Sequence, residues 1–458
     1  MNGPIIMKFG GTSVADAKRL RGVATLAARY ADSGVLLVLS AFSGVTDSLF
    51  AAGQEAIAGN DAEAFSLLSR MLERHRAVAA ELLGLDRGRG DALPEAVEAV
   101  LAAAEAELGA VLKGAALLRA LPDRSMDILA GRGELLSTTI LAAFLGAPWV
   151  DARTVMRTDS RFGCAKPLTD EIKALAAARL APLVRPGKIA VTQGYIGADE
   201  SGAPTTLGRG GSDYSASLFG AALGASEIQI WTDVEGVLTC DPRVVSEARP
   251  VESLGYDEAA ELAAFGAKVL HPATILPAVE LGIPVTVRNS MIPHGRFTTI
   301  SRESASGRPV TALASRAPVT VRTIRTPRML GGAGFLASIF EAFGRRGVSV
   351  DLVSTSEVSV SATVDGKAGV DELVADLEEL GEVRIERERA VVALVGERLL
   401  KTPGVPGRAL GALRDINVEM ISLGANEINL SLVVERGQAA EAQRRLHAAF
   451  FEGDEGRR

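Results

Sequence analysis

The sequence predicts an α/β fold with a mainly parallel sheet, followed by two smaller modules of ferredoxin-like βαββαβ topology. The first 60 residues read strand, small-residue loop, helix, twice in succession, which is typical of a parallel sheet covered by helices. The strand-like runs 5–9 and 35–40 are almost continuously apolar, as expected of strands buried on both faces. Near the C-terminus, residues 348–354 resemble residues 416–422, which indicates an internal repeat.

Length and composition restrict the class of protein. At 458 residues the chain predicts two to four domains, and its apolar content of 47% excludes general disorder. The net charge of -7 argues against a non-specific nucleic-acid binder. Cys164 and Cys240 are the two cysteines, and there is neither a signal-peptide pattern nor an apolar run of transmembrane length. We expect a cytoplasmic protein that binds neither nucleic acid nor membrane.

The first 290 residues are expected to fold in chain order as one α/β domain. Ser13 and Asp16 are expected to cap the first helix as a capping-box-like pair, and Ser212 to cap the helix after a glycine-rich loop. Residues 61–121 predict a helical excursion that serves as a lid or packing layer, with a coiled-coil partner surface as the alternative. Helices are expected over 14–30, 135–145, 169–180, 215–223, 256–265 and 272–281. Further strands are expected over 149–150, 189–196, 227–232 and 283–288.

Residues 289–308 are polar and rich in Gly and Pro, which predicts a linker. Beyond it, each copy of the repeat is preceded by a helical run and followed by an alternating strand and another helix. This order is that of a βαββαβ module, present twice. Chance alternation of apolar and polar residues is the competing explanation.

The glycine-rich loop 205–215 is the strongest candidate for a ligand site. Its glycines allow positive φ and close approach of the backbone, and the following helix start presents free N–H groups to an anion. Arg209 and Asp213 add opposite charges near the same point. Alone, such a loop is more often an ordinary turn, but similar loops follow the first two strands, at 10–13 and 41–47. Three such loops suit a polyphosphate and an anionic co-substrate.

Lys8 ends the first strand, where its amine can point into this crevice and neutralise charge in a transition state. A solvated surface lysine is the alternative. The sequence contains neither a P-loop motif nor the HRD and DFG motifs of protein kinases. His271 lies beside Pro272 and has no partner of catalytic-triad type, which favours a structural role. No Cys/His cluster has metal-ligand spacing, so no protein-held metal is predicted.

Six motifs, in order over essentially the whole chain, resemble those of aspartate kinases, in particular the monofunctional lysine-sensitive branch. They are KFGGTSV from Lys8, GRGELLST from Gly131, TLGRGGSDY from Thr206, WTDV from Trp231, DPR from Asp241 and FGAKVLHP from Phe265. The C-terminal repeats resemble paired ACT regulatory domains. Each motif alone is weakly specific, but the set is highly specific.

The resemblance implies an amino-acid-kinase fold, a three-layer sandwich, that transfers a phosphoryl group from ATP, with Mg²⁺, to the β-carboxylate of L-aspartate. The product, 4-phospho-L-aspartate, begins lysine, threonine and methionine biosynthesis. The implied domains are a kinase domain over 1–300, a first ACT domain over 318–385, and a second ACT domain formed by 309–316 with 386–452. Relatives pair through their ACT domains, so a homodimer or a dimer of dimers is expected.

The resemblance also implies residue roles. The catalytic residues would be Lys8, Asp213 and Lys268. Aspartate would be held by Ser40, Thr46, Glu134, Arg209 and Ser212. The nucleotide would meet Lys8, Gly10, Gly11, Ser13, Thr232, Asp233, Leu238, Arg243 and Lys268. An allosteric effector would meet Met329, Gly334, Phe335, Leu336, Ser349, Val350, Asp351, Ser356 and Glu357.

The chemistry of the acceptor predicts how the reaction is catalysed. A β-carboxylate has a reference pKa of about 4, so it is ionised at neutral pH and needs no general base. Catalysis then depends on in-line positioning and on charge neutralisation by Lys8, Lys268 and Mg²⁺. Asp213 is therefore expected to organise Lys8 and the glycine-rich loop.

Two departures from the family pattern concern the nucleotide and the effector. Many relatives carry a tyrosine at the position of Leu238, so the contact with the nucleotide is expected to be weaker there. Residues 331–333 are Gly-Gly-Ala, where lysine-sensitive relatives carry bulkier polar side chains. Asp351 and Glu357 are available to pair with effector amines. Lysine is the favoured effector, with threonine or no effector as alternatives.

Two other functions compete with an allosteric aspartate kinase. One is a related kinase that acts on glutamate, a carbamate or a nucleotide, which a substrate panel would detect. The other is a catalytically inactive amino-acid sensor, which would bind lysine without ATP turnover. The Glu134 and Arg209 pairing and the two ACT-like repeats argue against the first. The second is disfavoured by the charged residues that remain intact, which are Lys8, Arg209, Asp213 and Asp233.

Overall fold

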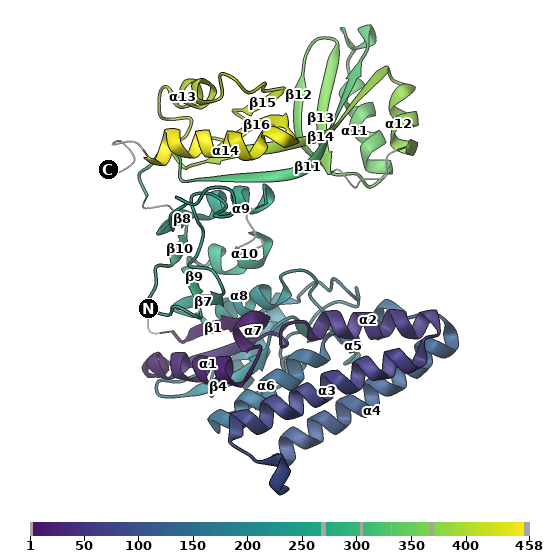
Figure 1. Ribbon diagram of the computed structural model, residues 1–458, viewed down its shortest axis with the longest axis vertical. Helices are drawn as coiled ribbons and strands as arrows, with labels where there is room; N and C mark the ends of the chain where they lie inside the picture. Colours follow the sequence, from purple (N-terminus) through teal and green to yellow (C-terminus); the bar gives the residue numbers. More distant parts are fainter. Residues whose placement is uncertain (1–2, 267–271, 303–305, 331, 366–370, 453–458) are drawn as a thin grey trace. The chain divides into compact units, whose positions relative to one another are not determined.

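The computed structural model describes residues 3–266, 272–302, 306–330, 332–365 and 371–452. Figure 1 shows the chain, which divides into two compact units. The first unit contains Met1–Val237 and Val269–Arg302, and the second contains Leu238–Lys268 and Glu303–Arg458. Lys268 and His271 lie outside the described residues, so the predictions made for them remain predictions.

The first unit is built on a mainly parallel sheet whose strands follow the order β3-β4-β2-β1-β7-β9-β10. Strands β1, β2 and β7 are parallel, and only β10 runs antiparallel to its neighbour β9 within this order. This confirms the predicted α/β class. The strands are β1 Ile5–Phe9, β2 Val35–Leu39, β3 Trp149–Val150, β4 Ile189–Gln193, β7 Glu227–Thr232, β9 Val285–Asn289 and β10 Thr298–Ser301. A separate hairpin joins β5 Ile196–Ala198 to β6 Pro204–Thr206.

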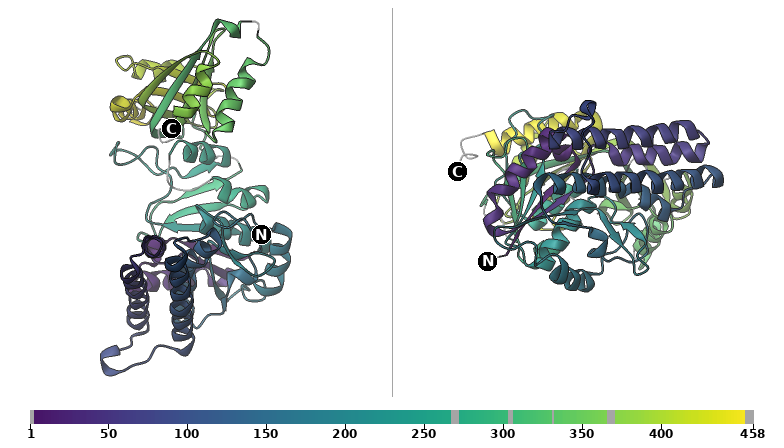
Figure 2. Two further views of the ribbon diagram at one scale, coloured as in Figure 1. Left: turned by 90° about the vertical axis from the view of Figure 1, so that its right-hand side faces the viewer. Right: turned by 90° about the horizontal axis from the view of Figure 1, so that it is seen from below.

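Helices of the first unit pack on this sheet and extend beyond it. They are α1 Ala17–Arg29, α2 Val45–Ala58, α3 Asp61–Leu83, α4 Glu95–Leu118, α5 Asp123–Ala130, α6 Arg132–Leu145, α7 Thr169–Arg179, α8 Gly211–Leu223 and α10 Pro272–Glu280. Figure 2 shows the long helices α3 and α4 beside α2. Leu68 and Leu101 of these helices share one hydrophobic core with Phe9 and Leu37 of the sheet, so the predicted packing layer is confirmed. The stretch Asp123–Leu145 is apolar enough for a membrane span, but 72% of its apolar window is buried, as in a core helix.

Four local expectations are wrong. The predicted linker contains β10, because residues 298–300 complete the sheet beside β9. The strand predicted over 189–196 ends at Gln193, because Gly194 packs closely on Ser212 and Tyr195 takes a positive φ of 71°. Asp16 caps α1 without Ser13, whose hydroxyl instead contacts Ser290 at 2.7 Å. Gly210, at φ 73°, occupies the N-cap of α8 in place of Ser212.

The second unit contains an antiparallel sheet of six strands in the order β12-β13-β11-β14-β16-β15. Its strands are β11 Ala312–Arg325, β12 Val350–Thr355, β13 Ser359–Asp365, β14 Glu382–Val395, β15 Met420–Leu423 and β16 Asn429–Glu435, with a short β8 Ser253–Gly255 elsewhere in the unit. Its helices are α9 Tyr256–Ala264, α11 Phe335–Arg345, α12 Asp371–Glu378, α13 Val405–Ala412 and α14 Ala439–His447. The two predicted ferredoxin-like modules are therefore present.

Strands β11 and β14 run through both modules. Residues 319–325 of β11 pair with β13, whereas residues 312–316 pair with 391–395 of β14 beside β16. Each module has its own core, one around Phe343 and the other around Leu394. The domain boundaries implied by the resemblance divide these continuous strands, and they stay predictions.

Residues 238–266 pack within the second unit. The Thr239 carbonyl accepts a hydrogen bond from Leu313 N at 2.8 Å, and the Thr239 hydroxyl contacts the buried His447 at 2.9 Å. The buried Glu258 carboxylate accepts hydrogen bonds from Thr311 and from Glu397 N. Two residues predicted to meet the nucleotide, Leu238 and Arg243, are therefore anchored to the same unit as the ACT modules.

Candidate active site

A pocket of about 570 Å³ opens in the first unit where β1 and β2 end. The carboxyl ends of parallel strands are the usual place for ligands in such folds. Nine of the predicted site residues line it: Lys8, Gly10, Gly11, Ser40, Thr46, Glu134, Arg209, Ser212 and Asp213. The three loops singled out in the sequence therefore meet at one pocket.

Lys8 and Asp213 form an ion pair in this pocket, with 2.7 Å between Nζ and Oδ1. Their side chains are only 11% and 14% exposed, so water screens the pair weakly. Lys8 lies on β1 in register with Val38 and Ile230, and Asp213 lies in the first turn of α8. The pair thus holds the start of α8 against the end of the central strand.

A chain of hydroxyl contacts connects the loop after β2 to the helices α8 and α6. The Ser40 hydroxyl donates to Ser212 Oγ at 3.0 Å, and the Ser137 hydroxyl donates to the Ser40 carbonyl at 2.8 Å. Ser212 comes from α8, Ser40 follows β2, and Ser137 belongs to α6. The loop after β2 is therefore fixed between two helices.

Glu134 is the most unusual charged group of the site. It is 3% exposed, and its Oε2 has no hydrogen-bond partner in the described parts of the chain. Burial raises the pKa of this carboxyl to about 7, although the backbone of Ala41 opposes the shift. A buried carboxylate of this kind lacks a counter-cation, and a ligand ammonium group in the pocket can supply one.

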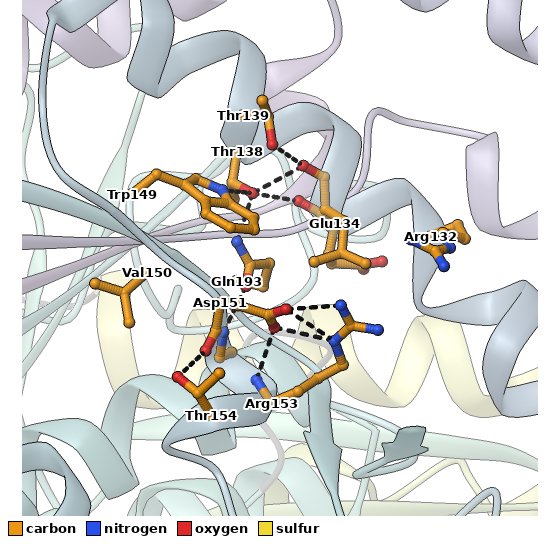
Figure 3. A network of polar contacts seen from close by, with 12 residues as sticks. Arg132, Glu134, Thr138, Thr139, Trp149, Val150, Asp151, Arg153, Thr154 and Gln193 are labelled. Atoms are coloured by element: carbon orange, nitrogen blue, oxygen red, sulfur yellow. Dashed lines mark hydrogen bonds and ion pairs between the residues drawn. The ribbon is translucent and has the colours of Figure 1, made fainter. Parts of the chain in front are cut away.

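Close packing places Glu134 at the pocket wall. A Cβ added to its neighbour Gly133 would lie 2.5 Å from the Cβ of Ala41, so only glycine allows this approach of α6 to the loop after β2. Figure 3 shows the contacts of Thr138 that fix α6 near Glu134. Thr138 donates to the Glu134 carbonyl and accepts from Trp149 and from Gln193. The helix is therefore tied to β3 and β4.

Arg209 is exposed at the rim of the pocket, between Gly208 and Gly210. Both glycines take positive φ, at 74° and 73°, which lets the loop turn sharply on either side of the arginine. Within the described ranges, the Arg209 side chain makes no hydrogen bond or ion pair with the protein. A planar guanidinium with free donors suits bidentate binding of a carboxylate.

The structure brings only some of the predicted nucleotide-binding residues together at the pocket. Gly10 and Gly11 line the pocket, but Ser13 does not, because its hydroxyl is buried against Ser290 and the Trp231 carbonyl. Thr232 ends β7 and Asp233 follows it in the same unit, and neither lines this pocket. Leu238 and Arg243 belong to the second unit, where Arg243 pairs with Asp241.

The predicted effector residues fall into two groups at opposite ends of β12. Val350 pairs with Val364, and Thr355 pairs with Val360 at the other end. Ser349, Val350 and Asp351 lie at the first end, and Ser356 and Glu357 follow the second. Asp351 forms an ion pair with Arg316 at 2.8 Å, and burial raises its pKa.

The remaining effector residues precede or begin α11. Gly334 forms the N-cap of this helix at φ 87°, Phe335 and Leu336 are its first two residues, and Met329 ends the preceding turn. Leu336 is 42% exposed. The effector residues therefore come from the start of α11 and from both ends of β12.

Sequence reasoning did not identify two residues of the pocket wall, Gly163 and Tyr195. Both come from segments without a local ligand signature. Tyr195 has φ 71° between β4 and β5, and a positive φ at a tyrosine is itself a sign of a constrained site, but it is not visible in the sequence.

The fold and the pocket define a kinase of small carboxylic acids with attached regulatory modules. Residues 3–289 match the model of the Amino acid kinase family, and residues 392–450 match an ACT domain model. The chain belongs to the aspartokinase family, which confirms the function predicted from the six motifs. It is 40% identical to "Lysine-sensitive aspartokinase 3" of Escherichia coli, over 98% of this chain and 99% of that protein. It is 39% identical to "Aspartokinase 3, chloroplastic" of Arabidopsis thaliana, over 98% and 82%.

Solved structures agree with this assignment. Escherichia coli aspartokinase III in complex with aspartate and ADP matches with a TM-score of 0.80 and 38% identity, covering 98% of this chain and 100% of that one. The same enzyme in complex with lysine and aspartate matches with a TM-score of 0.78 and 39% identity, covering 98% and 99%. The similarity therefore extends over both units.

Proposed function

We propose that the pocket at the ends of β1 and β2 binds L-aspartate beside the terminal phosphates of ATP and transfers the γ-phosphoryl group to the β-carboxylate. The observation that carries the proposal is the placement of Lys8, Glu134 and Arg209 around one pocket. Its test is ADP release with L-aspartate as the only acceptor. Release that needs both L-aspartate and Mg²⁺ supports the proposal, and release that is independent of the acceptor contradicts it.

Two of the charged side chains at the pocket, Glu134 and Arg209, orient the amino acid. Glu134 binds the α-ammonium group, since its buried carboxylate lacks a cation, and Arg209 binds the α-carboxylate. Ser40, Thr46 and Ser212 provide hydroxyl groups between them. The β-carboxylate then points toward Lys8, which neutralises charge on the transferring group.

The nucleotide is held by Gly10 and Gly11 at the phosphates, and by Ser13, Thr232, Asp233, Leu238, Arg243 and Lys268 further along. Mg²⁺ arrives with the ATP phosphates, as is usual in phosphoryl transfer, since the described residues contain no cluster of three metal-ligating side chains. The enzyme is expected in the cytoplasm.

Asp213 organises Lys8 and is not a general base, because the acceptor carboxylate is already ionised. We expect Asp213→Asn to lower kcat by about 10²-fold, since Lys8 loses its only described ion-pair partner. Steady-state kinetics from pH 6 to 9 check this. The hypothesis fails if kcat stays nearly intact, or if kcat follows a single ionisation that the substitution abolishes.

Glu134→Gln should weaken aspartate binding and remove the pH dependence of KM for aspartate. In the native enzyme, KM for aspartate should rise as pH falls below about 7, because protonation of Glu134 removes the charge that binds the ammonium group. The variant should show a KM raised by about 10–100-fold at pH 8 and little change with pH. A variant that keeps the native pH profile would contradict the assignment.

The same substitution should stabilise the unliganded protein. The folded-state pKa of Glu134, about 7, lies above the ordinary glutamate value of 4.5, so the stability present below pH 4.5 is lost as pH rises through 7. Glutamine carries no such penalty, and we expect it to raise the free energy of unfolding by roughly 3 kcal/mol at pH 8. Urea unfolding at pH 8 measures the gain.

L-lysine is the proposed allosteric inhibitor, with Asp351 and Glu357 as its charged contacts. Asp351→Asn should raise the lysine concentration for half inhibition by about 10-fold or more, while activity without lysine stays within a factor of two. Asp376→Asn, which changes an aspartate of α12 in the same module, is the matched control. Unchanged lysine sensitivity in the Asp351 variant would exclude this contact.

A homodimer, alone or as a dimer of dimers, is proposed through the ACT modules. The two effector groups are separated by about 16 Å along β12, which is further than one amino acid reaches, so a second chain is needed to bring both groups to one ligand. Analytical ultracentrifugation should show at least a dimer, and a protein that stays monomeric with lysine present would contradict the proposal.

A further inference from the structure

One buried side chain, that of Asp127, holds two segments at the pocket rim. It has none of the roles proposed above. Asp127, in α5, is 2% exposed. Its Oδ1 accepts a hydrogen bond from the Thr206 hydroxyl at 2.7 Å, and its Oδ2 accepts one from Thr206 N at 2.9 Å. Gly163 N donates to both oxygens, at 3.0 and 2.9 Å.

These contacts act on the loop that presents Arg209. Thr206 begins that loop, and Gly163 packs against Gly208 within it, where an added Cβ would lie 3.2 Å from the Gly163 carbonyl oxygen. A further hydrogen bond, from Ala165 N to the Thr206 carbonyl, joins the two segments at 2.9 Å. Asp127 therefore sits at the point where both segments meet, behind the pocket wall.

The charges and hydrogen-bond donors around Asp127 indicate how its carboxylate holds the two segments. No lysine or arginine within the described ranges forms an ion pair with Asp127. Burial raises the pKa of this carboxyl, and the hydrogen bonds from Gly163 and Thr206 oppose that shift. A carboxylate can accept from all of these donors at once, whereas an amide of the same shape must turn its NH₂ group toward at least one of them.

We propose that Asp127 is a positioning residue that fixes the Gly208–Arg209–Gly210 turn, and thereby sets the subsite for the α-carboxylate of aspartate. The inference rests on the proposed role of Arg209. Asp127 does not touch the substrate. It fixes Thr206 and Gly163, and they hold the turn that carries the guanidinium.

Asp127→Asn should raise KM for L-aspartate by about 30-fold, with kcat changed less than threefold and KM for ATP unchanged. Thr206→Val, which removes one of the hydrogen bonds, should raise KM for aspartate by a smaller factor of about 5. Thr206→Ser keeps the hydroxyl and should behave as the native enzyme. If Asp127→Asn does not fold, the Thr206 pair still tests the proposal.

A second measurement, limited proteolysis, tests how firmly the loop is held and does not depend on enzyme activity. Trypsin cleaves after arginine, and Arg209 is exposed in this loop, so a loosened loop in Asp127→Asn should be cut after Arg209 faster than in the native protein. Cleavage after the exposed Arg179 of α7 serves as the internal control. An unchanged rate of cleavage together with an unchanged KM for aspartate would overturn the proposal.

The outcomes also separate this proposal from the role of Arg209. A fall of kcat together with a rise of both KM values in Asp127→Asn, with lowered stability, means a general structural role and overturns positioning. If Arg209→Ala leaves KM for aspartate unchanged, the proposed binding mode itself fails. If Arg209→Ala raises KM and Asp127→Asn does not, only the inference about Asp127 fails.

Discussion

Lys8→Met should lower kcat by about 10³-fold, equivalent to ~4 kcal/mol of transition-state stabilisation, with much smaller changes in both KM values. Lys8 is the cation that the fold holds at the end of the central strand, 11% exposed and within 2.7 Å of Asp213. Methionine has similar length and packs in the same space, but it leaves the charge of the transferring phosphoryl group uncompensated. Steady-state kinetics with saturating Mg-ATP and aspartate measure the loss.

The control for this substitution is Lys18→Met, because Lys18 is exposed on α1 and outside the pocket. It should keep native kcat and KM values. A Lys8→Met enzyme with kcat within fivefold of native would contradict the catalytic role, whereas an effect confined to a raised KM for ATP would assign Lys8 to nucleotide binding alone.

Arg209→Ala should lower kcat/KM for aspartate by about 10²–10³-fold, mostly through KM. Within the described residues, the guanidinium has no protein partner and lies at the rim of a pocket whose other wall carries Glu134. Removing it leaves the α-carboxylate of the substrate without its bidentate partner. KM for ATP should stay within about twofold, since the phosphates are held by the other loops.

Arg209→Lys distinguishes geometry from charge. Lysine keeps the positive charge but loses the planar fork, so we expect an intermediate loss of about 10-fold or more. Arg179→Ala on the exposed face of α7 is the matched control and should leave kcat/KM for aspartate unchanged. Equal effects of alanine and lysine at position 209 would show that bidentate binding is the whole contribution, and no effect of either would exclude the assignment.

The parts of the fold that the sequence predicts best are those where local pattern and burial agree. Strands β1 and β7 have the predicted limits, because β1 is a mainly apolar run that is buried throughout and β7 alternates apolar and polar residues with a buried centre. The helix α8 begins near the expected place because Gly210 permits the positive φ that a sharp turn requires. The three loops meet because parallel strands bring their carboxyl ends to one edge.

Features that depend on distant partners could not be predicted in this way. β10 forms because its residues meet β9, although their composition resembles a linker. The Ser13 hydroxyl contacts the hydroxyl of Ser290, which is distant in sequence, so Asp16 caps α1 without it. Asp127 and Gly163 have no ligand signature, because their importance arises from hydrogen bonds between segments far apart in sequence. The two groups of effector residues are adjacent in sequence, but β12 carries them to opposite ends.

The most direct test is a hydroxylamine trap for acyl phosphate with Mg-ATP, comparing L-aspartate with L-glutamate, in native enzyme and in Lys8→Met, with and without L-lysine. We predict acyl phosphate from aspartate at least about 10²-fold faster than from glutamate, suppressed by L-lysine and lost in the variant. No acyl phosphate from either amino acid, in folded protein that binds lysine, would contradict the account and favour a catalytically inactive sensor.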